Sequence, residues 1–278
     1  MKKTKFIIAI IFALALGIAS CSSAGSGSSG ETPGSTGSAT EPPDETFGLA
    51  PEVLYQFDLG AQIPALAGFE LRGRRITFEA GAATNLHDHS ERPGGLYVIE
   101  GALTEFRNGG EGTILEVGDS WIEEADLEHW IRNHTDEDAV AIVVDIVPTP
   151  DASPEPLAEN GEEIEIDGEA PNETSGLVPE ELGLFDIGEQ IEGADGVSFR
   201  MREITIEPNG ATNVHNHAER PGIGYVLEGE FTNAITSGPR SLAAGDSWEE
   251  QVDLEHWVAN LTEDPVRILV FDLVVEEG

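Results

Sequence analysis

The chain has one cysteine, Cys21, and its three lysines, Lys2, Lys3 and Lys5, all lie at the extreme N-terminus. A single cysteine excludes an internal disulfide. Basic residues are scarce throughout, since 14 Lys and Arg stand against 53 Asp and Glu in 278 residues, for a net charge of −39. Nucleic acid and anionic membrane surfaces carry the same sign of charge, so we expect neither to bind the folded part.

The excess of acid has two explanations that the composition leaves open. It favours either adaptation to a salty habitat or the solubility of an exported protein. Adaptation to salt predicts that the thermal midpoint rises between low and molar salt, because salt screens the repulsion between acidic groups. A flat or falling midpoint would contradict it.

The N-terminus has the pattern of a secretion signal over residues 1–20. Three lysines precede the apolar residues 6–19, and this run is shorter than the ~20 residues that a membrane-spanning helix needs. The run Ile18-Ala19-Ser20-Cys21 resembles the end of a bacterial lipoprotein signal. That resemblance implies lipidation of Cys21 and tethering to the outer face of a membrane in the cell envelope, in the periplasm or outside the cell. The alternative is an ordinary cleaved signal followed by an unimportant thiol.

Residues 21–46 are rich in Ser, Gly, Thr and Pro and are expected to form a flexible tether, because they cannot bury a core. Beyond them the chain repeats itself. Residues 84–94 read TNLHDHSERPG, and residues 212–222 read TNVHNHAERPG, 128 positions later. Matching the chain to itself predicts two domains, 47–148 and 177–278, joined by an acidic linker, 149–176.

Two details of the repeat concern its loops. The offset falls to 127 after Phe106, which predicts a hairpin tip of unequal length at residues 107–112. In the linker, Ile164 and Ile166 alternate with Glu and could add a short strand.

No segment of ten residues after the N-terminal 46 has a helical stripe of apolar residues. Short β-branched or aromatic runs, such as 74–78, 96–99 and 141–144, are instead separated by Gly, Pro, Asn and Asp. The pattern predicts an all-β protein, a sandwich or barrel, with closure into a jelly roll as the usual protection of sheet edges.

Histidines are the main functional signal. His87 and His89 are one residue apart in an extended segment, so their side chains project to one face about 7 Å apart and can reach one metal ion. His215 and His217 repeat this spacing. A buried, hydrogen-bonded core histidine is the alternative reading of each.

The whole pattern resembles the cupin superfamily. Its first motif has Gly, two His one residue apart and a closing Gly; its second has Gly-Asp, a His and an Asn. The matching residues are Gly81, His87, His89, Gly101, Gly118, Asp119, His129 and Asn133 in the first copy, and His215, His217, Gly229, Gly245, Asp246, His256 and Asn260 in the second. The resemblance implies a bicupin, two tandem β-barrels (jelly rolls), each with a divalent-metal site. Six of the seven histidines fall on ligand positions, and only His134 is left over.

One departure from the family pattern affects the ligand set. The position of a fourth ligand, a glutamate, holds Gly94 in the first copy and Gly222 in the second. Three neutral imidazoles remain, with open coordination positions that suit Fe(II), Zn, Ni, Mn or Cu. Glu91 and Glu219 are tentative substitutes because they continue the inward parity of the histidines, provided that the strand has not ended before them.

Other duplicated residues surround the motifs. Trp121 pairs with Trp248 and Trp130 with Trp257; they are either pocket walls or plain core. Arginines are also duplicated, and an inward arginine would select an anionic ligand, although surface ion pairs are the common role. The duplicated arginines are Arg72, Arg74 and Arg92, with Arg200, Arg202 and Arg220.

Three hypotheses for function follow. The first is a metal-dependent enzyme, such as a dioxygenase acting on a small molecule. The second is a non-catalytic surface lipoprotein that binds a metal or small ligand, and the third is a structural module with empty barrels. The sequence has no nucleophile triad, phosphate loop or hydride-cofactor fingerprint. It names no catalytic residue, because the first two hypotheses share every residue of the site.

Overall fold

The computed structural model describes residues 41–149, 160–166, 168–218, 220–235, 238–252 and 254–275. The signal, Cys21 and most of the predicted tether lie outside the described residues. By its contacts, Ala39–Gly278 forms one compact unit. Within the described part of the chain, no helix is long and apolar enough to cross a membrane.

The described residues form two antiparallel sheets, one for each copy of the repeat, and one short 3-10 turn, η1 (Pro64–Leu66). The first sheet contains β1 (Phe47–Asp58), β2 (Phe69–Ala83), β3 (His87–Asp88), β4 (Gly94–Glu100), β5 (Ala102–Arg107), β6 (Gly112–Glu116), β7 (Ser120–Glu123), β8 (Glu128–Arg132) and β9 (Ala139–Pro148). The second contains β10 (Glu162–Glu163), β11 (Ser175–Asp186), β12 (Val197–Ala211), β13 (His215–Asn216), β14 (Gly222–Glu228), β15 (Glu230–Ile235), β16 (Gly238–Ala243), β17 (Ser247–Glu250), β18 (Glu255–Ala259) and β19 (Val266–Val275).

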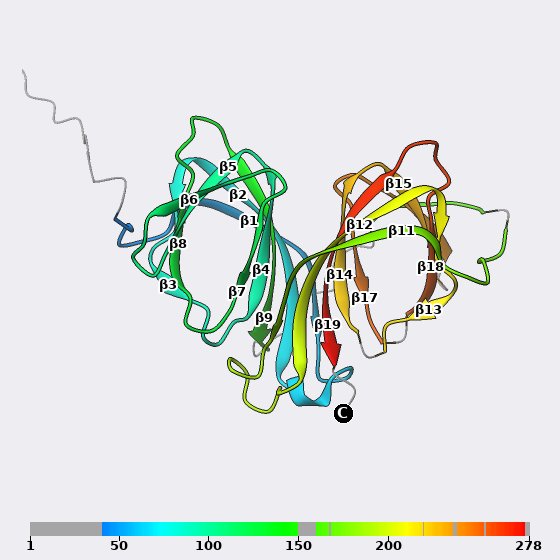
Figure 1. Ribbon diagram of the computed structural model, residues 1–278, viewed down its shortest axis with the longest axis horizontal. Helices are drawn as coiled ribbons and strands as arrows, with labels where there is room; N and C mark the ends of the chain where they lie inside the picture. The colour runs from blue at the N-terminus through cyan, green and yellow to red at the C-terminus, as the bar shows by residue number, and fades with distance from the viewer. Residues whose placement is uncertain are drawn as a thin grey trace, which may run out of the picture. The chain divides into compact units, whose positions relative to one another are not determined.

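The strand orders of the two sheets match. The first runs β6-β5-β8-β2-β9-β4-β7, and the second runs β16-β15-β18-β12-β19-β14-β17 with β10 added at the β16 edge. Figure 1 shows each sheet curving around into a barrel. The prediction of an all-β protein with two tandem jelly-roll barrels is confirmed. We call β1–β9 the first barrel and β10–β19 the second barrel.

The longest apolar runs within the two repeats, residues 139–147 and 266–275, form strands that are buried on both faces. In β9, Ile142, Val144 and Ile146 pack in a core cluster that contains residues of both barrels, whereas Ala141 and Val143 pack inside the first barrel. Because side chains alternate between the faces of a strand, an unbroken apolar run is required where both faces are covered. The β19 strand is used in the same way, with alternate residues in the shared core and inside the second barrel.

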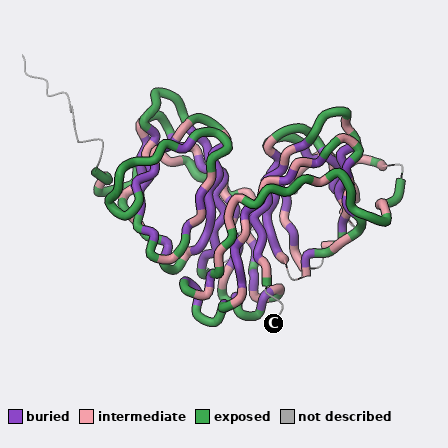
Figure 2. Tube along the Cα trace, in the orientation of Figure 1, coloured by how far each residue is buried: buried purple, intermediate pink, exposed green. Residues whose placement is uncertain are grey.

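The shared core joins the two barrels. Tyr97 donates a hydrogen bond of 2.9 Å to Glu203 Oε2 of the second barrel, and both Tyr97 and Tyr225 belong to the shared cluster. Figure 2 shows buried residues along these central strands and exposed residues in the loops at the barrel ends. Because residues of both barrels pack in this one core, the contacts do not divide the chain at the predicted limits. The domain limits 47–148 and 177–278 therefore stay a prediction.

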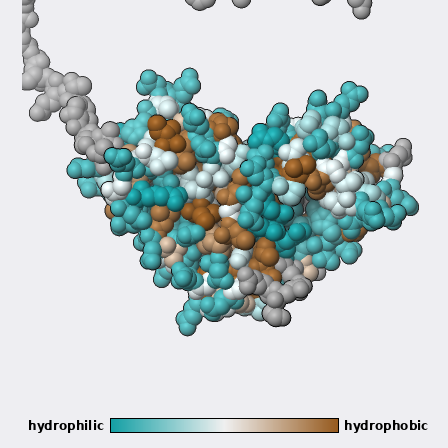
Figure 3. Space-filling model, in the orientation of Figure 1, coloured by the Kyte–Doolittle hydropathy of each residue, from teal (hydrophilic) through white to brown (hydrophobic). Residues whose placement is uncertain are grey.

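The loops agree in part with the sequence analysis. Asn108 and Gly109 have positive φ between β5 and β6, where the repeat predicted a hairpin tip. In the linker, the short strand β10 lies just before the predicted residues; it pairs with β16, and the Ile164 amide donates to Pro239 O at 3.0 Å. Figure 3 shows a mainly hydrophilic surface on the face in view, as the acidic composition leads one to expect.

Candidate metal centres

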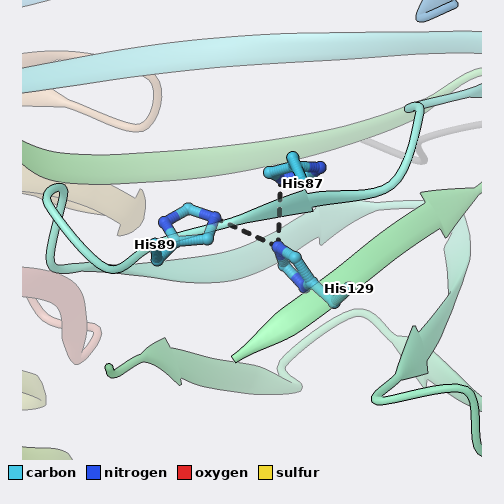
Figure 4. Close-up of side chains that lie close together, drawn as sticks. All are labelled: His87, His89 and His129. Atoms are coloured by element: carbon cyan, nitrogen blue, oxygen red, sulfur yellow. Dashed lines mark hydrogen bonds between the residues drawn. The ribbon is translucent and has the colours of Figure 1, made fainter. Parts of the chain in front are cut away.

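Three histidines of the first barrel meet in space. His87 lies on β3, His89 directly follows β3, and the pairing of β3 with β8 sets His87 opposite His129. The Nε2 atom of His129 lies 3.1 Å from that of His87 and 3.1 Å from that of His89. Figure 4 shows the three rings turned toward one another. We call this group the first centre.

The second barrel repeats the arrangement with His215, His217 and His256, which we call the second centre. His215 stands opposite His256 in the pairing of β13 with β18. The Nε2 atom of His256 lies 2.9 Å from that of His217 and 3.0 Å from that of His215. In each centre the three ligand atoms lie within 4.8 Å of one another, so each could hold a metal ion.

The other ring nitrogen, Nδ1, of each histidine faces an oxygen acceptor. In the first centre the acceptors are Asn85 O at 2.9 Å from His87, Arg92 O at 3.1 Å from His89 and Glu105 Oε1 at 2.7 Å from His129. In the second they are Asn213 O at 3.0 Å from His215, Arg220 O at 3.3 Å from His217 and Asn233 Oδ1 at 2.7 Å from His256. Because these oxygens accept, the Nδ1 atoms carry the protons and donate.

This proton arrangement fits a metal ion. Burial lowers the pKa of His87 and of His256 to about 4 and also lowers that of His215, so these rings are neutral at pH 7. With protons on Nδ1, the lone pairs of three Nε2 atoms converge, and they repel unless a cation lies between them. Ligand nitrogens at right angles on an ion with ~2.1 Å bonds would lie about 3 Å apart, which is close to the distances from the third histidine to the other two in each centre.

The tentative carboxylate ligand of the first centre, Glu91, does not join the three histidines. β3 ends at Asp88, and Glu91 lies exposed in the turn that follows, outside the group of three histidines. Its inward direction depended on the strand continuing, which it does not. Glu219 lies outside the described residues.

The glycines at the fourth-ligand position have a steric reason. A Cβ atom on Gly94 would lie 2.6 Å from Val144 O, and one on Gly222 would lie 2.7 Å from Phe271 O. Both distances are too short for a real contact, because β4 and β14 run close against β9 and β19. A glutamate therefore cannot stand at either position without moving the backbone.

Two buried glutamates beside the centres were missed by the sequence analysis. Glu123 Oε2 lies 3.0 Å from His89 Nδ1, and Glu250 Oε2 lies 3.0 Å from His217 Nδ1. Burial opposes ionisation of Glu123, but its contact with His89 and the charges nearby lower its pKa to about 2, and the pKa of Glu250 is also lowered. They lie on the Nδ1 side of the rings, away from the converging Nε2 atoms. The repeat at offset 127 was the available signal, but acids are too common in this chain to stand out.

Each centre opens into a pocket. The first pocket, of about 300 Å³, is lined by His87, His89, Glu123, Arg74 and Arg92 among apolar side chains. The second, of about 290 Å³, has the equivalent residues: His215, His217, Glu250, Arg202 and Arg220, together with His256. The size is that of a site for a small molecule.

The pocket arginines are organised by a buried acid. Asp145, on β9, is fully buried, and its Oδ2 atom lies 2.8 Å from Nη2 of both Arg72 and Arg74 and 3.6 Å from Nη1 of Arg92. The second barrel repeats the cluster on Asp272, at 2.7 Å from Arg200, 2.8 Å from Arg202 and 3.7 Å from Arg220. The duplicated arginines are thus not surface ion pairs of the common kind.

The tryptophans divide between core and pocket. Trp121 and Trp248 are both buried inside their barrels. Trp248 also lines the second pocket and donates from Nε1 to Glu250 Oε1 at 3.1 Å, whereas Trp121 Nε1 has no hydrogen-bond partner in the described part of the chain. Trp130 stacks on Phe106 at a ring distance of 4.0 Å.

The asparagines of the second motif, Asn133 and Asn260, bond to the backbone of neighbouring loops and do not line the pockets. Asn133 is fully buried, and its Nδ2 atom donates to the backbone oxygens of Phe78 and Glu137 at 3.0 and 2.8 Å. Asn260 does the same with Ile206 O and Asp264 O. Their role is to satisfy buried carbonyls at the turn after the third histidine.

One residue of the second barrel reaches the first centre. Gln190 Nε2 donates to His89 O at 2.7 Å and to Glu123 O at 3.1 Å. Gln62 occupies the matching position of the first barrel, yet both polar atoms of its side chain are buried without a partner among the described residues. The two centres therefore differ in their support from the other barrel.

The chain belongs to the cupin family. The cupin domain profile matches residues 74–145 and 202–272, together just over half of the chain, and each match contains a complete histidine triad. The search of curated proteins found no match. The chain is thus a bicupin, two cupin domains in tandem.

Solved structures share the fold. A protein described as glyoxylate-induced from Pseudomonas aeruginosa has a TM-score of 0.57 at 15% identity, over 85% of this chain and 83% of that one. Protein Ylba from E. coli has a TM-score of 0.53 at 12% identity, and the match covers 85% of this chain and 87% of that one. Salicylate 1,2-dioxygenase from Pseudaminobacter salicylatoxidans has a TM-score of 0.51 at 13% identity, and the match covers 73% of this chain and 70% of that one. At these identities the likeness concerns the fold alone.

Proposed function

We propose that each barrel binds a divalent transition metal through its three histidines and receives a small anionic molecule, a carboxylate, in the pocket beside it. One observation carries the proposal: in both barrels the Nε2 atoms of three histidines converge at one end of a pocket lined by two arginines. The metal would be Fe, Mn, Zn, Ni or Cu, since imidazole ligands suit all of these.

The local charge supports an anion. Six of the 11 arginines lie in the two clusters around Asp145 and Asp272. Each cluster sets three guanidinium groups against one aspartate and the glutamate beside the histidines, which leaves a positive excess in a chain of net charge −39. Positive charge held in a pocket of an acidic protein selects an anion, and a guanidinium matches a carboxylate in geometry.

A metal at this site would supply a Lewis acid with open coordination positions, because the described residues offer three histidines at each centre and no carboxylate among them. Apolar side chains line part of each pocket, and the arginines would orient the anion toward the histidines. These features support a metal-dependent enzyme, and a dioxygenase is the first activity to test because a salicylate 1,2-dioxygenase shares the fold. A surface protein that binds its ligand without turnover is the alternative outcome.

Metal content tests the proposal directly. Protein purified without chelators should contain about two metal ions per chain. Exchange of His87 and His89 for Ala should remove one, and exchange of His215 and His217 should remove the other. Absence of metal in every preparation, including after loading with Fe(II), Mn(II) and Zn(II), would refute the metal sites.

Anion binding and turnover are separate tests. Arg92→Met and Arg220→Met should each weaken carboxylate binding at one centre by about tenfold, the value of one charged hydrogen bond, without loss of metal. Arg75→Met, at a half-exposed ion pair with Glu100 outside both pockets, is the matched control. Oxygen uptake by the Fe(II) form with a panel of small carboxylates would identify an enzyme; binding without uptake across the panel would identify a binding protein.

Export and lipid anchoring are a further proposal, supported by the sequence of residues 1–21. In a bacterial host, the chain should fractionate with membranes, and Cys21→Ser should release it. A wild-type chain recovered entirely in soluble fractions would contradict the anchor.

A further inference from the structure

The two centres differ in the residue that backs their third histidine. His129 Nδ1 donates to the carboxylate of Glu105 at 2.7 Å, whereas His256 Nδ1 donates to the amide oxygen of Asn233, also at 2.7 Å. Both acceptors are buried. The geometry is therefore the same, and the formal charge of the acceptor is not.

The difference extends to the next residue on the same face. Glu105 Oε2 accepts from Arg107 Nε at 2.7 Å, and the strand pairing sets Arg107 opposite His129. In the second barrel the same pairing sets Ile235 opposite His256. The first barrel thus has a Glu–Arg pair where the second has Asn and Ile.

The carboxylate is the more effective of the two charges at the first centre. The Glu105 side chain is 3% exposed and touches the histidine, while the Arg107 side chain is 43% exposed and faces water. Solvent screens the guanidinium more strongly than the buried carboxylate. A negative charge therefore acts on His129 that has no counterpart on His256 in the described residues.

We propose that Glu105 is a positioning residue that makes the first centre the tighter of two unequal metal sites, and that Asn233 leaves the second centre weaker and more readily exchanged. The inference rests on the proposed metal binding. A carboxylate that accepts the Nδ1 proton holds the ring in place and makes Nε2 a stronger donor, and its charge attracts the cation. An amide oxygen holds the ring equally well but adds no charge.

Chains with one working centre allow the affinities to be compared. The first centre alone remains in His215→Ala/His217→Ala, and the second alone in His87→Ala/His89→Ala. Titration with Co(II) against a chelator of known affinity gives the dissociation constant, and the visible absorption of Co(II) reports the coordination. The first centre should bind ~10–100-fold more tightly, which is the usual effect of such a supporting residue.

Exchange of the supporting pair between the barrels is the decisive experiment. Glu105→Asn/Arg107→Ile should weaken the first centre to the level of the second, and Asn233→Glu/Ile235→Arg should strengthen the second by a similar factor. A gain of affinity cannot come from damage to the fold. If the first exchange does not fold, Glu105→Gln keeps the size of the side chain and tests the charge alone.

The outcomes separate this inference from the proposed function. Equal affinities in the two centres, unchanged by the exchanges, would refute the role of Glu105 while both centres still bind metal. Failure of both centres to bind Co(II) would refute the metal sites themselves.

Discussion

The two barrels carry the same three histidines, the same buried aspartate and the same three arginines, but they support them differently. The first centre has Glu105 behind its third histidine and Gln190 of the other barrel on the backbone of its second. The second centre has Asn233 behind its third histidine, and Trp248 bonded to its glutamate. The repeat has preserved the histidines and the pocket lined by arginines, whereas the groups that contact the histidines from behind have diverged.

This contrast separates two kinds of residue. The duplicated ones define what the pocket can hold, since their positions follow from the strand pairing that both barrels share. The diverged residues lie behind the histidines. A change of charge or hydrogen bonding there would alter the donor strength of a histidine without moving the three histidines apart. Four comparisons between the barrels test this division.

The largest effect is expected at the buried aspartates. Asp145→Asn and Asp272→Asn should each destabilise the protein by about 3 kcal/mol, because three partly buried guanidinium groups lose their counter-charge. Urea unfolding monitored by tryptophan fluorescence would measure it. The two losses of stability should be similar because the clusters are duplicated. A loss above about 3 kcal/mol in one variant with a loss below about 1 kcal/mol in the other would show that the clusters are not equivalent.

The glutamines should behave differently from each other. Gln190→Leu removes two hydrogen bonds to backbone oxygens and should cost about 2 kcal/mol. Gln62→Leu removes an amide that has no partner among the described residues, so its effect should lie within about 0.5 kcal/mol or be stabilising. The urea midpoints of both variants give the comparison, and equal losses would contradict it.

Acid should destabilise the metal-free protein through both centres. The pKa of His87 and of His256 is about 4 in the folded chain, below the 6.5 of an unperturbed histidine. The unfolded state takes up protons first, so stability is lost as the pH falls from 6.5 toward 4, by at most about 3 kcal/mol per ring and, after screening by solvent, on the order of 1 kcal/mol. His87→Gln and His256→Gln should each flatten the dependence of the urea midpoint on pH; a stability that rises on acidification would contradict both shifts.

The smallest difference concerns the tryptophans. Trp121→Phe and Trp248→Phe remove similar buried area, but only Trp248 has a hydrogen bond to lose among the described residues. Trp248→Phe should therefore cost about 0.5–1 kcal/mol more than Trp121→Phe. Thermal unfolding of the two variants would resolve it, and a greater loss at Trp121 would reverse the comparison.

Much of the fold and most of each histidine group could be predicted before the structure. The alternation of His87 and His89 and the offset of 128 are patterns along the chain, and strand geometry converts them directly into positions in space. The third histidine of the group, His129, came from the resemblance to cupins, not from spacing. The direction of Glu91 could not be predicted, because it depends on where β3 ends.

The residues that contact the histidines and arginines could not be predicted from the sequence, for a different reason. Asp145 lies 73 positions from Arg72, and Glu105 lies 24 positions from His129, so their contacts depend on strand pairing. In a chain with 53 acids, no single carboxylate stands out until its burial is known. The duplication of the arginines can be read from the sequence, but the aspartate that each group of arginines contacts cannot.

The sequence by itself determined that this protein is a tandem repeat of β-strands with paired histidines, because side-chain alternation and internal similarity are properties of the chain. Only the tertiary structure decided which acids lie beside those histidines, that six arginines gather on two aspartates, and that Glu105 and Asn233 lie behind the third histidine of the two centres. These features depend on burial and on contacts across the sheets, and a charge gains its effect on a ligand only when folding removes the water between them.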